Sequence, residues 1–270
     1  MPCPYHYAMM KNKLETIFTE FVATIKRLRD PDGCPWDKAQ TPETLKPYII
    51  EEAYEAVEAI EGKDPKAVCE ELGDLLLQIV LQAQVFSETG AFTIADVIAG
   101  INAKMHERHP HVFGDAEAKT PEDVRKHWVR IKQEQKGGKS SALGDVPRAL
   151  PALLRAKRLS DNAAEVGFDW PNREEVEKKV REEWDELEQA VAKQDPAQIT
   201  HEFGDLLFAL VNLARFLKVN PDEALRQTID RFTARFRFIE ESARAAGQRL
   251  EEMSLEEMES YWQEAKRRGL

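Results

Sequence analysis

Two pairs of carboxylates, repeated in the two halves of the chain, are the residues best suited to chemistry. In each half a Glu-x-x-Asp pair begins 19 residues after the start of a Glu-x-x-Glu pair. The eight residues are Glu52, Glu55, Glu71 and Asp74 in the first half, and Glu183, Glu186, Glu202 and Asp205 in the second. A spacing of three places both members of a pair on one side of a helix. Two such pairs on neighbouring helices can form one cage of oxygen ligands for Mg²⁺, with Mn²⁺ as a substitute.

The two sets of carboxylates belong to a duplication of the chain. An offset of 131 residues aligns 51–55 with 182–186, 71–74 with 202–205, and 26–28 with 157–159. A single acidic helix face is usually only a solvated surface. Here both pairs recur in the same order, and the second pair stands on a helix, 65–88, whose apolar residues wrap most of its circumference. We expect that helix to be buried. Because buried carboxylates are costly unless they are paired or bound to metal, the pattern favours a metal site in each copy.

The elements that must position these carboxylates are all predicted to be helices. Apolar residues recur at spacings of three and four, and strand alternation is absent. The expected helices are 12–29, 43–61, 65–88, 94–108 and 121–135 in the first copy, and 148–164, 173–193, 196–217, 221–245 and 255–268 in the second. Asp64 and Thr93 are expected N-caps, and Pro65, Pro196 and Pro221 fit first-turn positions.

The sequence therefore predicts an all-α fold made of two tandem four-helix-bundle units. The first domain is expected at 12–136 and the second at 147–270. Between them, residues 137–146 begin with glycine, lysine and serine and are expected to form a flexible linker.

Composition narrows the classes of partner and compartment. The chain of 270 residues has a formal net charge of −11, which argues against nucleic acid or an anionic membrane as its partner. Its three cysteines form no CxxC pair, which indicates a reducing compartment. There is no apolar run of membrane-spanning length, so we expect a cytoplasmic protein.

Other metal chemistries fit less well. Di-iron bundles use Glu-x-x-His on two helices, and no histidine here follows a glutamate at that spacing. A calcium-binding loop is also absent.

Basic and aromatic residues at helical spacing suggest the ligand of the metal. Arg231 and Arg235 are four residues apart, as are Trp262 and Lys266. The first copy has matching pairs in Lys104 with Arg108 and Trp128 with Lys132. Cations facing a carboxylate-bound metal form a phosphate clamp, and an aromatic ring can stack on a base. Each set alone is weak, because such residues more often form surface or core.

Together these residues resemble the MazG family of nucleoside triphosphate pyrophosphohydrolases in its long, two-domain form. The resemblance extends from about Leu14 to Lys266. It is carried by the segments 33–41, 51–60, 71–78, 108–115, 150–159, 166–170, 182–186 and 202–215, among which HPHVF and VGFDW lie outside the carboxylate motifs.

The resemblance implies an all-α dimer that cleaves NTPs or dNTPs between the α- and β-phosphates with Mg²⁺, using the C-terminal copy for catalysis. Carried over, the metal ligands of that copy are Glu183, Glu186, Glu202 and Asp205. Phosphate would bind Lys179, Arg231 and Arg235, and the nucleotide would contact Trp262 and Lys266. A related long form has lysine where this chain has Arg231, so the contact keeps its charge and changes its geometry.

We therefore predict a hydrolase that converts nucleoside triphosphates, ATP included, to monophosphate and pyrophosphate in cleaning or regulating nucleotide pools. Glu182 is the candidate general base.

The alternative is a helical dimer that senses nucleotides or binds a partner protein, with structural metal. The copies differ at Gln78 and Gln82, which correspond to Ala209 and Leu213. The first copy could thus be silent, differently specific or regulatory.

The helix 202–217 also predicts assembly. It is apolar on more sides than one bundle covers, which favours a homodimer with this helix at or near the interface. The residues concerned are Leu206, Leu207, Phe208, Leu210, Val211, Leu213 and Phe216.

Overall fold

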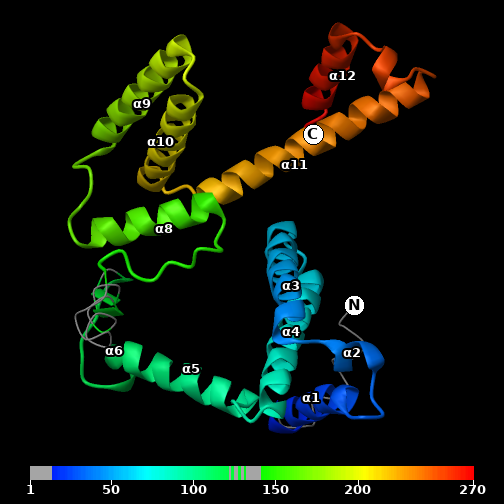
Figure 1. Cartoon of the computed structure of the whole chain (residues 1–270), viewed down its shortest axis with the longest axis vertical. Helices are drawn as coiled ribbons and strands as arrows, with labels where there is room; N and C mark the ends of the chain where they lie inside the picture. Colours follow the sequence, from blue (N-terminus) through cyan, green and yellow to red (C-terminus); the bar gives the residue numbers. More distant parts are fainter. Residues whose placement is uncertain (1–13, 122, 125–126, 129–130, 132–140) are drawn as a thin grey trace. The chain divides into compact units, whose positions relative to one another are not determined.

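The structure is a computed structural model that describes residues 14–270 except 122, 125–126, 129–130 and 132–140. All regular elements in these described residues are helices, which confirms the all-α prediction (Figure 1). The chain divides into two compact units, Met1–Lys132 and Gln133–Leu270. Each unit is described by itself below.

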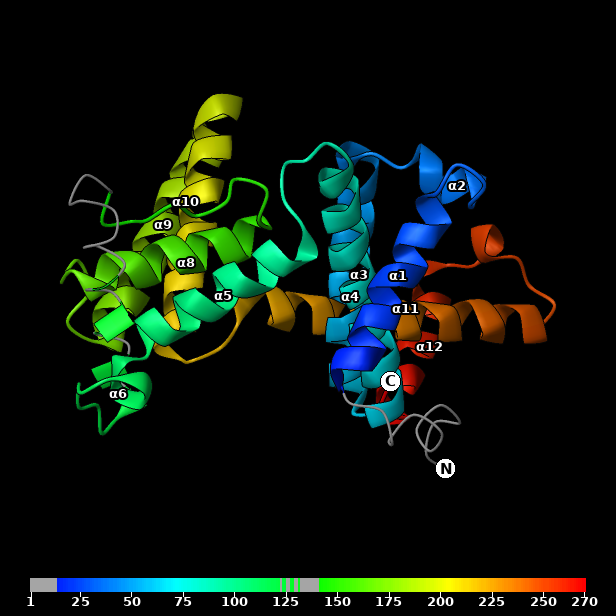
Figure 2. The same ribbon diagram turned by 90° about the horizontal axis from the view of Figure 1, so that it is seen from below.

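The first unit is centred on an antiparallel pair of long helices. Its elements are α1 (Leu14–Arg29), α2 (Pro35–Ala39), α3 (Pro42–Gly62), α4 (Pro65–Glu88), α5 (Ile94–Arg108) and α6 (Pro110–Phe113). Helices α3 and α4 pack along their lengths, and α1 packs against α4 (Figures 1 and 2). The core where α1, α3 and α4 meet consists of Ile25, Leu45, Val80, Leu81 and Val85.

Local sequence explains where these helices begin and end. Helix α4 begins at Pro65 after the N-cap Asp64, whose carboxylate accepts a hydrogen bond from the backbone N–H of Lys66 at 2.9 Å. The C-cap of α3, Lys63, is in the left-handed conformation (φ 57°), so the chain reverses directly into α4. Thr93 and Asp96 form a capping box at the start of α5. The predicted caps at Asp64 and Thr93 are confirmed.

The second unit repeats this plan. Its elements are α8 (Ala152–Glu165), α9 (Arg173–Lys193), α10 (Pro196–Phe216), α11 (Pro221–Ala245), η1 (Leu250–Glu252) and α12 (Leu255–Arg267). Helices α9 and α10 form the central antiparallel pair, and α8 packs against α10. Helix α11 leads away from this pair, and α12 folds back against α11 (Figure 1). Pro196 and Pro221 occupy first-turn positions, as predicted.

Several details differ from the predictions. The helix expected at 148–164 begins at Ala152, because Pro151 is its N-cap residue and has a non-helical ψ of 139°. The short helices α2 and α6 were not predicted, since four or five residues carry too little periodicity. The helix expected at 121–135 and the linker expected at 137–146 lie partly outside the described residues.

The expectation that 65–88 is buried around most of its circumference is wrong for the single chain. Leu72, Leu76 and Ile79 form an exposed stripe at spacings of four and three. Packing against α1 and α3 covers only the opposite side, where Val80, Leu81 and Val85 are buried. None of the helices within the described ranges is long and apolar enough to cross a bilayer.

Candidate metal and nucleotide site

In the second unit three carboxylates meet between α9 and α10. Glu183 and Glu186 on α9 and Glu202 on α10 each offer an oxygen, and these oxygens lie within 4.8 Å of one another. The tight reversal at Gln194 (φ 54°), followed by the N-cap Asp195, brings the first turns of α10 back against α9. Glu183 is buried, Glu202 is half-buried and Glu186 is exposed. The donor set, carboxylate oxygens from two helices, suits a hard divalent cation.

The electrostatics of this cluster favour a bound cation. Desolvation raises the pKa of Glu186 above its ordinary value, and the charges of Glu183 and Glu202 raise it further. Lys179 supplies a positive charge beside this cluster: its Nζ lies 2.7 Å from carboxylate oxygens of both Glu182 and Glu183. Hydrogen bonds to these carboxylates raise the pKa of Lys179 above its usual range. The ammonium is therefore charged and holds two of the site's acids.

Asp205, the fourth predicted ligand, lies outside the three-residue cluster. It follows Glu202 by one helical turn, is half-buried, and its Oδ2 is 3.4 Å from Nε2 of His201. Sequence reasoning missed His201, although its spacing of four before Asp205 places both on one side of α10.

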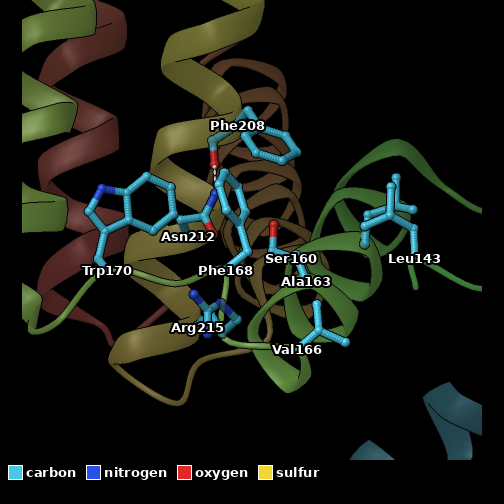
Figure 3. A pocket seen from close by; sticks show the side chains of 10 residues that line it. Leu143, Ser160, Ala163, Val166, Phe168, Trp170, Phe208, Asn212 and Arg215 are labelled. Carbon is cyan, nitrogen blue, oxygen red and sulfur yellow. Dashed lines mark hydrogen bonds between the residues drawn. The ribbon is translucent and has the colours of Figure 1, made fainter. Parts of the chain in front are cut away.

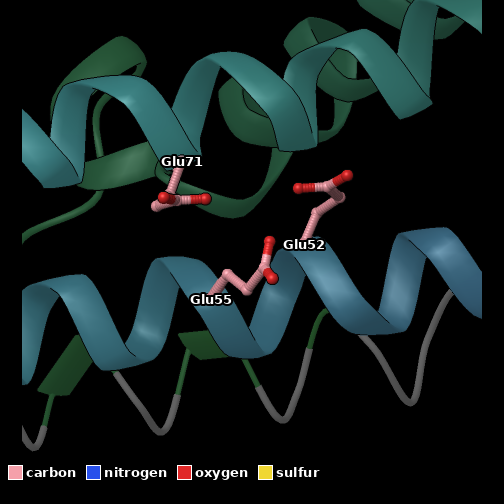
Figure 4. Close-up of side chains that lie close together, drawn as sticks. All are labelled: Glu52, Glu55 and Glu71. Atoms are coloured by element: carbon pink, nitrogen blue, oxygen red, sulfur yellow. The ribbon is translucent and has the colours of Figure 1, made fainter.

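The first unit contains a corresponding cluster. Glu52 and Glu55 on α3 face Glu71 on α4, again with oxygens within 4.8 Å (Figure 4). Burial raises the pKa of Glu52, and the nearby charge of Asp74 adds to that rise. Desolvation also raises the pKa of Glu71, and the nearby charge of Glu55 raises it further.

The two clusters differ in what balances their charge. Tyr48 stands where the second unit has Lys179. In its place the buried Gln78 donates from Nε2 to Glu52 at 3.4 Å. The first cluster thus has a neutral amide where the second has an ammonium ion. Within the described residues no lysine or arginine pairs with Glu52, Glu55 or Glu71, so the first cluster carries the greater uncompensated negative charge.

Apart from Lys179, the predicted phosphate- and base-binding residues lie on α11 and α12. The Arg235 guanidinium lies 5.4 Å and the Lys266 Nζ 5.9 Å from the centre of the Trp262 ring. Arg235 also donates to the Leu270 carbonyl at 2.7 Å, and Arg231 donates to the Thr228 hydroxyl at 2.8 Å. Because α11 leads away from α9 and α10, the second unit does not bring this group to its own carboxylates (Figure 1).

The corresponding residues of the first unit are only partly described. Lys104 and Arg108 lie on α5, and the Trp128 ring meets His109 edge-on at 5.3 Å. Lys132 lies outside the described residues.

The fold and the site place the chain among duplicated all-α proteins that hold clusters of carboxylates between two antiparallel helices. A sequence model of the MazG nucleotide pyrophosphohydrolase domain matches residues 40–113 and 172–237. The chain belongs to this family.

Three relatives align with more than nine tenths of this chain. The Thermotoga maritima nucleoside triphosphate pyrophosphohydrolase/pyrophosphatase MazG is 48% identical over 251 residues, covering 93% of this chain and 96% of that protein. The Escherichia coli K12 nucleoside triphosphate pyrophosphohydrolase is 44% identical over 264 residues, covering 96% of this chain and 99% of that protein. The Bacillus subtilis uncharacterized protein YabN is 49% identical over 251 residues, but the match covers only 51% of that protein.

Proposed function

We propose that this chain hydrolyses nucleoside triphosphates, with ribose or deoxyribose, to nucleoside monophosphate and pyrophosphate in the presence of Mg²⁺. The observation that carries the proposal is the carboxylate cluster of the second unit with Lys179 beside it. Those acids can hold a cation, and the ammonium can meet a phosphate oxygen. The names of the Thermotoga maritima and Escherichia coli relatives support the same activity.

The residues of the second unit have distinct roles in this proposal. Mg²⁺ would be held by Glu183, Glu186 and Glu202 with Asp205, and when bound it would neutralise phosphate charge and acidify a water. When substrate binds, the Lys179 ammonium would move from Glu182 and Glu183 to the phosphates, where it would balance their negative charge. Glu182, released from Lys179, is then free to accept the proton of the attacking water as general base.

The cationic group on α11 and α12 fits this reaction if a second copy of the chain supplies it. We infer a homodimer in which Arg231, Arg235, Trp262 and Lys266 of one copy approach the carboxylates of the other. The chain's exposed apolar stripes support such pairing. On α10 the stripe is Phe203, Leu207 and Leu210, and on α11 it is Leu225, Ile229, Phe232 and Phe236.

The domain assignment and the cellular setting remain part of the proposal. The proposed domains are 12–136 and 147–270, joined by a linker at 137–146, and the division of the chain into the units Met1–Lys132 and Gln133–Leu270 supports a two-domain organisation. The proposed setting is the cytoplasm, and a net charge of −11 argues against nucleic acid or an anionic membrane as partner.

The test is a panel of NTPs and dNTPs assayed at neutral pH with Mg²⁺ and with EDTA, with products separated by anion exchange. Monophosphate and pyrophosphate are expected in equal amounts, only with metal, and not from the Glu202→Gln variant. Release of diphosphate and phosphate would refute the cleavage position. Nucleotide binding without turnover would instead support the alternative of a nucleotide-sensing protein.

A further inference from the structure

In the part of the chain that the structure describes, no lysine or arginine balances the carboxylate cluster of the first unit. Glu52, Glu55 and Glu71 bring oxygens within 4.8 Å of one another between α3 and α4 (Figure 4). Desolvation raises the pKa of Glu52 and Glu71, and the neighbouring charges that raise it further all belong to other carboxylates. In the second unit the charge of Lys179 opposes the corresponding rise in the pKa of Glu186. The first cluster therefore either takes up protons or binds a cation.

A buried glutamine lies against this cluster and has one polar atom without a partner. Gln78, on α4, is 6% exposed, and its Nε2 donates to an oxygen of Glu52 at 3.4 Å. That hydrogen bond fixes the orientation of the carboxamide, because an ionised carboxylate only accepts. The Gln78 Oε1 is buried and accepts no hydrogen bond from the described residues. Because an unpaired buried acceptor is costly, this oxygen indicates that a cation or a hydrogen-bond donor binds beside the carboxylates.

The chemistry and spacing of these atoms favour a hard divalent cation. All of the available ligand atoms are oxygens, and an amide oxygen is a neutral ligand that such cations accept together with carboxylates. Oxygens that share one ion lie at most twice the metal–oxygen distance apart, which is about 4.2 Å for Mg²⁺ and about 4.8 Å for Ca²⁺. The carboxylate oxygens of the cluster lie within 4.8 Å of one another, so one cation can reach all three with little movement of the side chains.

The second unit differs in both respects. Ala209 stands at the position of Gln78, so no carboxamide extends toward the carboxylates from that turn of α10. Lys179 instead places its ammonium 2.7 Å from an oxygen of the buried Glu183. The second cluster is thus partly neutralised by the chain's own cation, and a metal ion has to compete with it.

A buried amide on α10 of the second unit lies in a different region. Asn212 is 1% exposed, and its Nδ2 donates to the Phe208 carbonyl at 3.1 Å. Figure 3 places Asn212 between Trp170 and Phe168. This amide is therefore held among aromatic rings, whereas the amide of Gln78 is held against a carboxylate.

We propose that the first unit holds a resident divalent cation, bound without nucleotide by its three clustered carboxylates and by the Gln78 carboxamide. The cation joins α3 to α4 and neutralises the carboxylates that face each other there, so it stabilises the first unit. The second unit acquires its cation together with the substrate phosphates, which draw the Lys179 ammonium away. The inference goes beyond the proposed hydrolysis, because a resident cation requires no turnover.

The experiment measures Mg²⁺ binding to the full chain, stripped with EDTA, in the absence of nucleotide. Isothermal titration calorimetry should show one tight binding event per chain, with a Kd lower by about tenfold or more than that of the second site. Glu71→Gln keeps the shape of the side chain and removes its charge, so it should abolish the tight event. Glu202→Gln in the second unit should leave that event unchanged. Mg²⁺ should raise the melting temperature of the wild type more than that of Glu71→Gln.

A second pair of variants tests the glutamine. Gln78→Ala introduces the residue found at Ala209 and should weaken the tight event by about tenfold, the loss of roughly one interaction. Gln82→Ala is the matched control. Gln82 is one turn further along α4 and also has a buried, unpaired Oε1, but its Nε2 donates to the Pro42 carbonyl at 3.1 Å and not to a carboxylate. Its Kd for Mg²⁺ should match that of the wild type.

Several results would overturn the inference. A tight event that survives in Glu71→Gln, or that is lost in Glu202→Gln, would place the cation outside the first cluster. Equal affinities in Gln78→Ala and Gln82→Ala would remove Gln78 from the site, and wild-type protein without tight binding would remove the resident cation. Because no nucleotide enters these titrations, a failure to release pyrophosphate would count against the proposed function alone.

Discussion

Lys179 gives the sharpest test of how the second unit balances its charge. The perturbation is Lys179→Met, which keeps an apolar stem of similar length and removes the ammonium. That ammonium lies 2.7 Å from oxygens of both Glu182 and Glu183. In the metal-free protein it is the cation paired with these acids. The first unit, with Tyr48 at this position, already shows such a cluster without a lysine.

Two effects of opposite sign are expected. Because the Lys179 side chain is 36% exposed, solvent screening limits the lost ion pairs to about 1 kcal/mol, so the metal-free protein should melt a few degrees lower. Mg²⁺ should bind more tightly, since a competing positive charge is gone. Repulsion between Mg²⁺ and a unit charge at about 5 Å in water is about 1.7 kcal/mol, which corresponds to a Kd lower by roughly tenfold.

Mg²⁺ binding is measured by isothermal titration calorimetry and metal-free stability by thermal melting in EDTA. The matched control is Lys178→Met, the adjacent lysine, which pairs with Glu175 at 2.6 Å outside the cluster. Turnover should fall in Lys179→Met because the phosphate loses a cation, while Mg²⁺ affinity rises. A Kd for Mg²⁺ that weakens, or that matches Lys178→Met, would show that Lys179 does not compete with the metal.

Three further outcomes are expected. Glu202→Ala or Asp205→Ala should abolish turnover and leave the circular dichroism spectrum unchanged. Glu71→Ala should lower turnover much less. More than a tenth of normal activity in Glu202→Ala would remove the second cluster from the mechanism. The folded-state pKa of Glu186 is raised from its reference of 4.5, so the folded state binds more protons. Metal-free stability should therefore fall as pH rises from that value through the raised pKa, and Glu186→Gln should show a smaller fall when melting is followed in EDTA. Light scattering at low micromolar concentration should give about 62 kDa, twice the chain mass of 30.9 kDa, and a mass near that of one chain would refute the dimer.

Helices and their limits followed closely from local sequence. The predicted ranges 65–88, 94–108, 173–193 and 221–245 agree with α4, α5, α9 and α11 residue for residue. Their starts are set by adjacent caps and prolines, which act within one turn. Where that chemistry is weaker the prediction failed, as at the later start of α8. Helix α2 and helix α6 are too short to show a period.

The carboxylate pairs were also accessible from sequence, because spacing within a helix fixes which side chains share a side. Glu183 with Glu186, and Glu52 with Glu55, needed no tertiary information. Which residue of the facing helix completes each cluster is set by how two helices pack. Packing brings Glu202 and Glu71 within 4.8 Å of their partners and leaves Asp205 outside the three-residue cluster.

Sequence by itself determined the duplication, the all-α class, the helix limits and the paired acids, since all of these depend on residues near one another in the chain or on a fixed offset. Only the tertiary structure decided which atoms are buried and unpaired. It placed Lys179 on two acids, kept Arg235 and Trp262 apart from the carboxylates of their own unit, and buried Asn212. Burial and helix packing join residues far apart in sequence, and no local pattern specifies them.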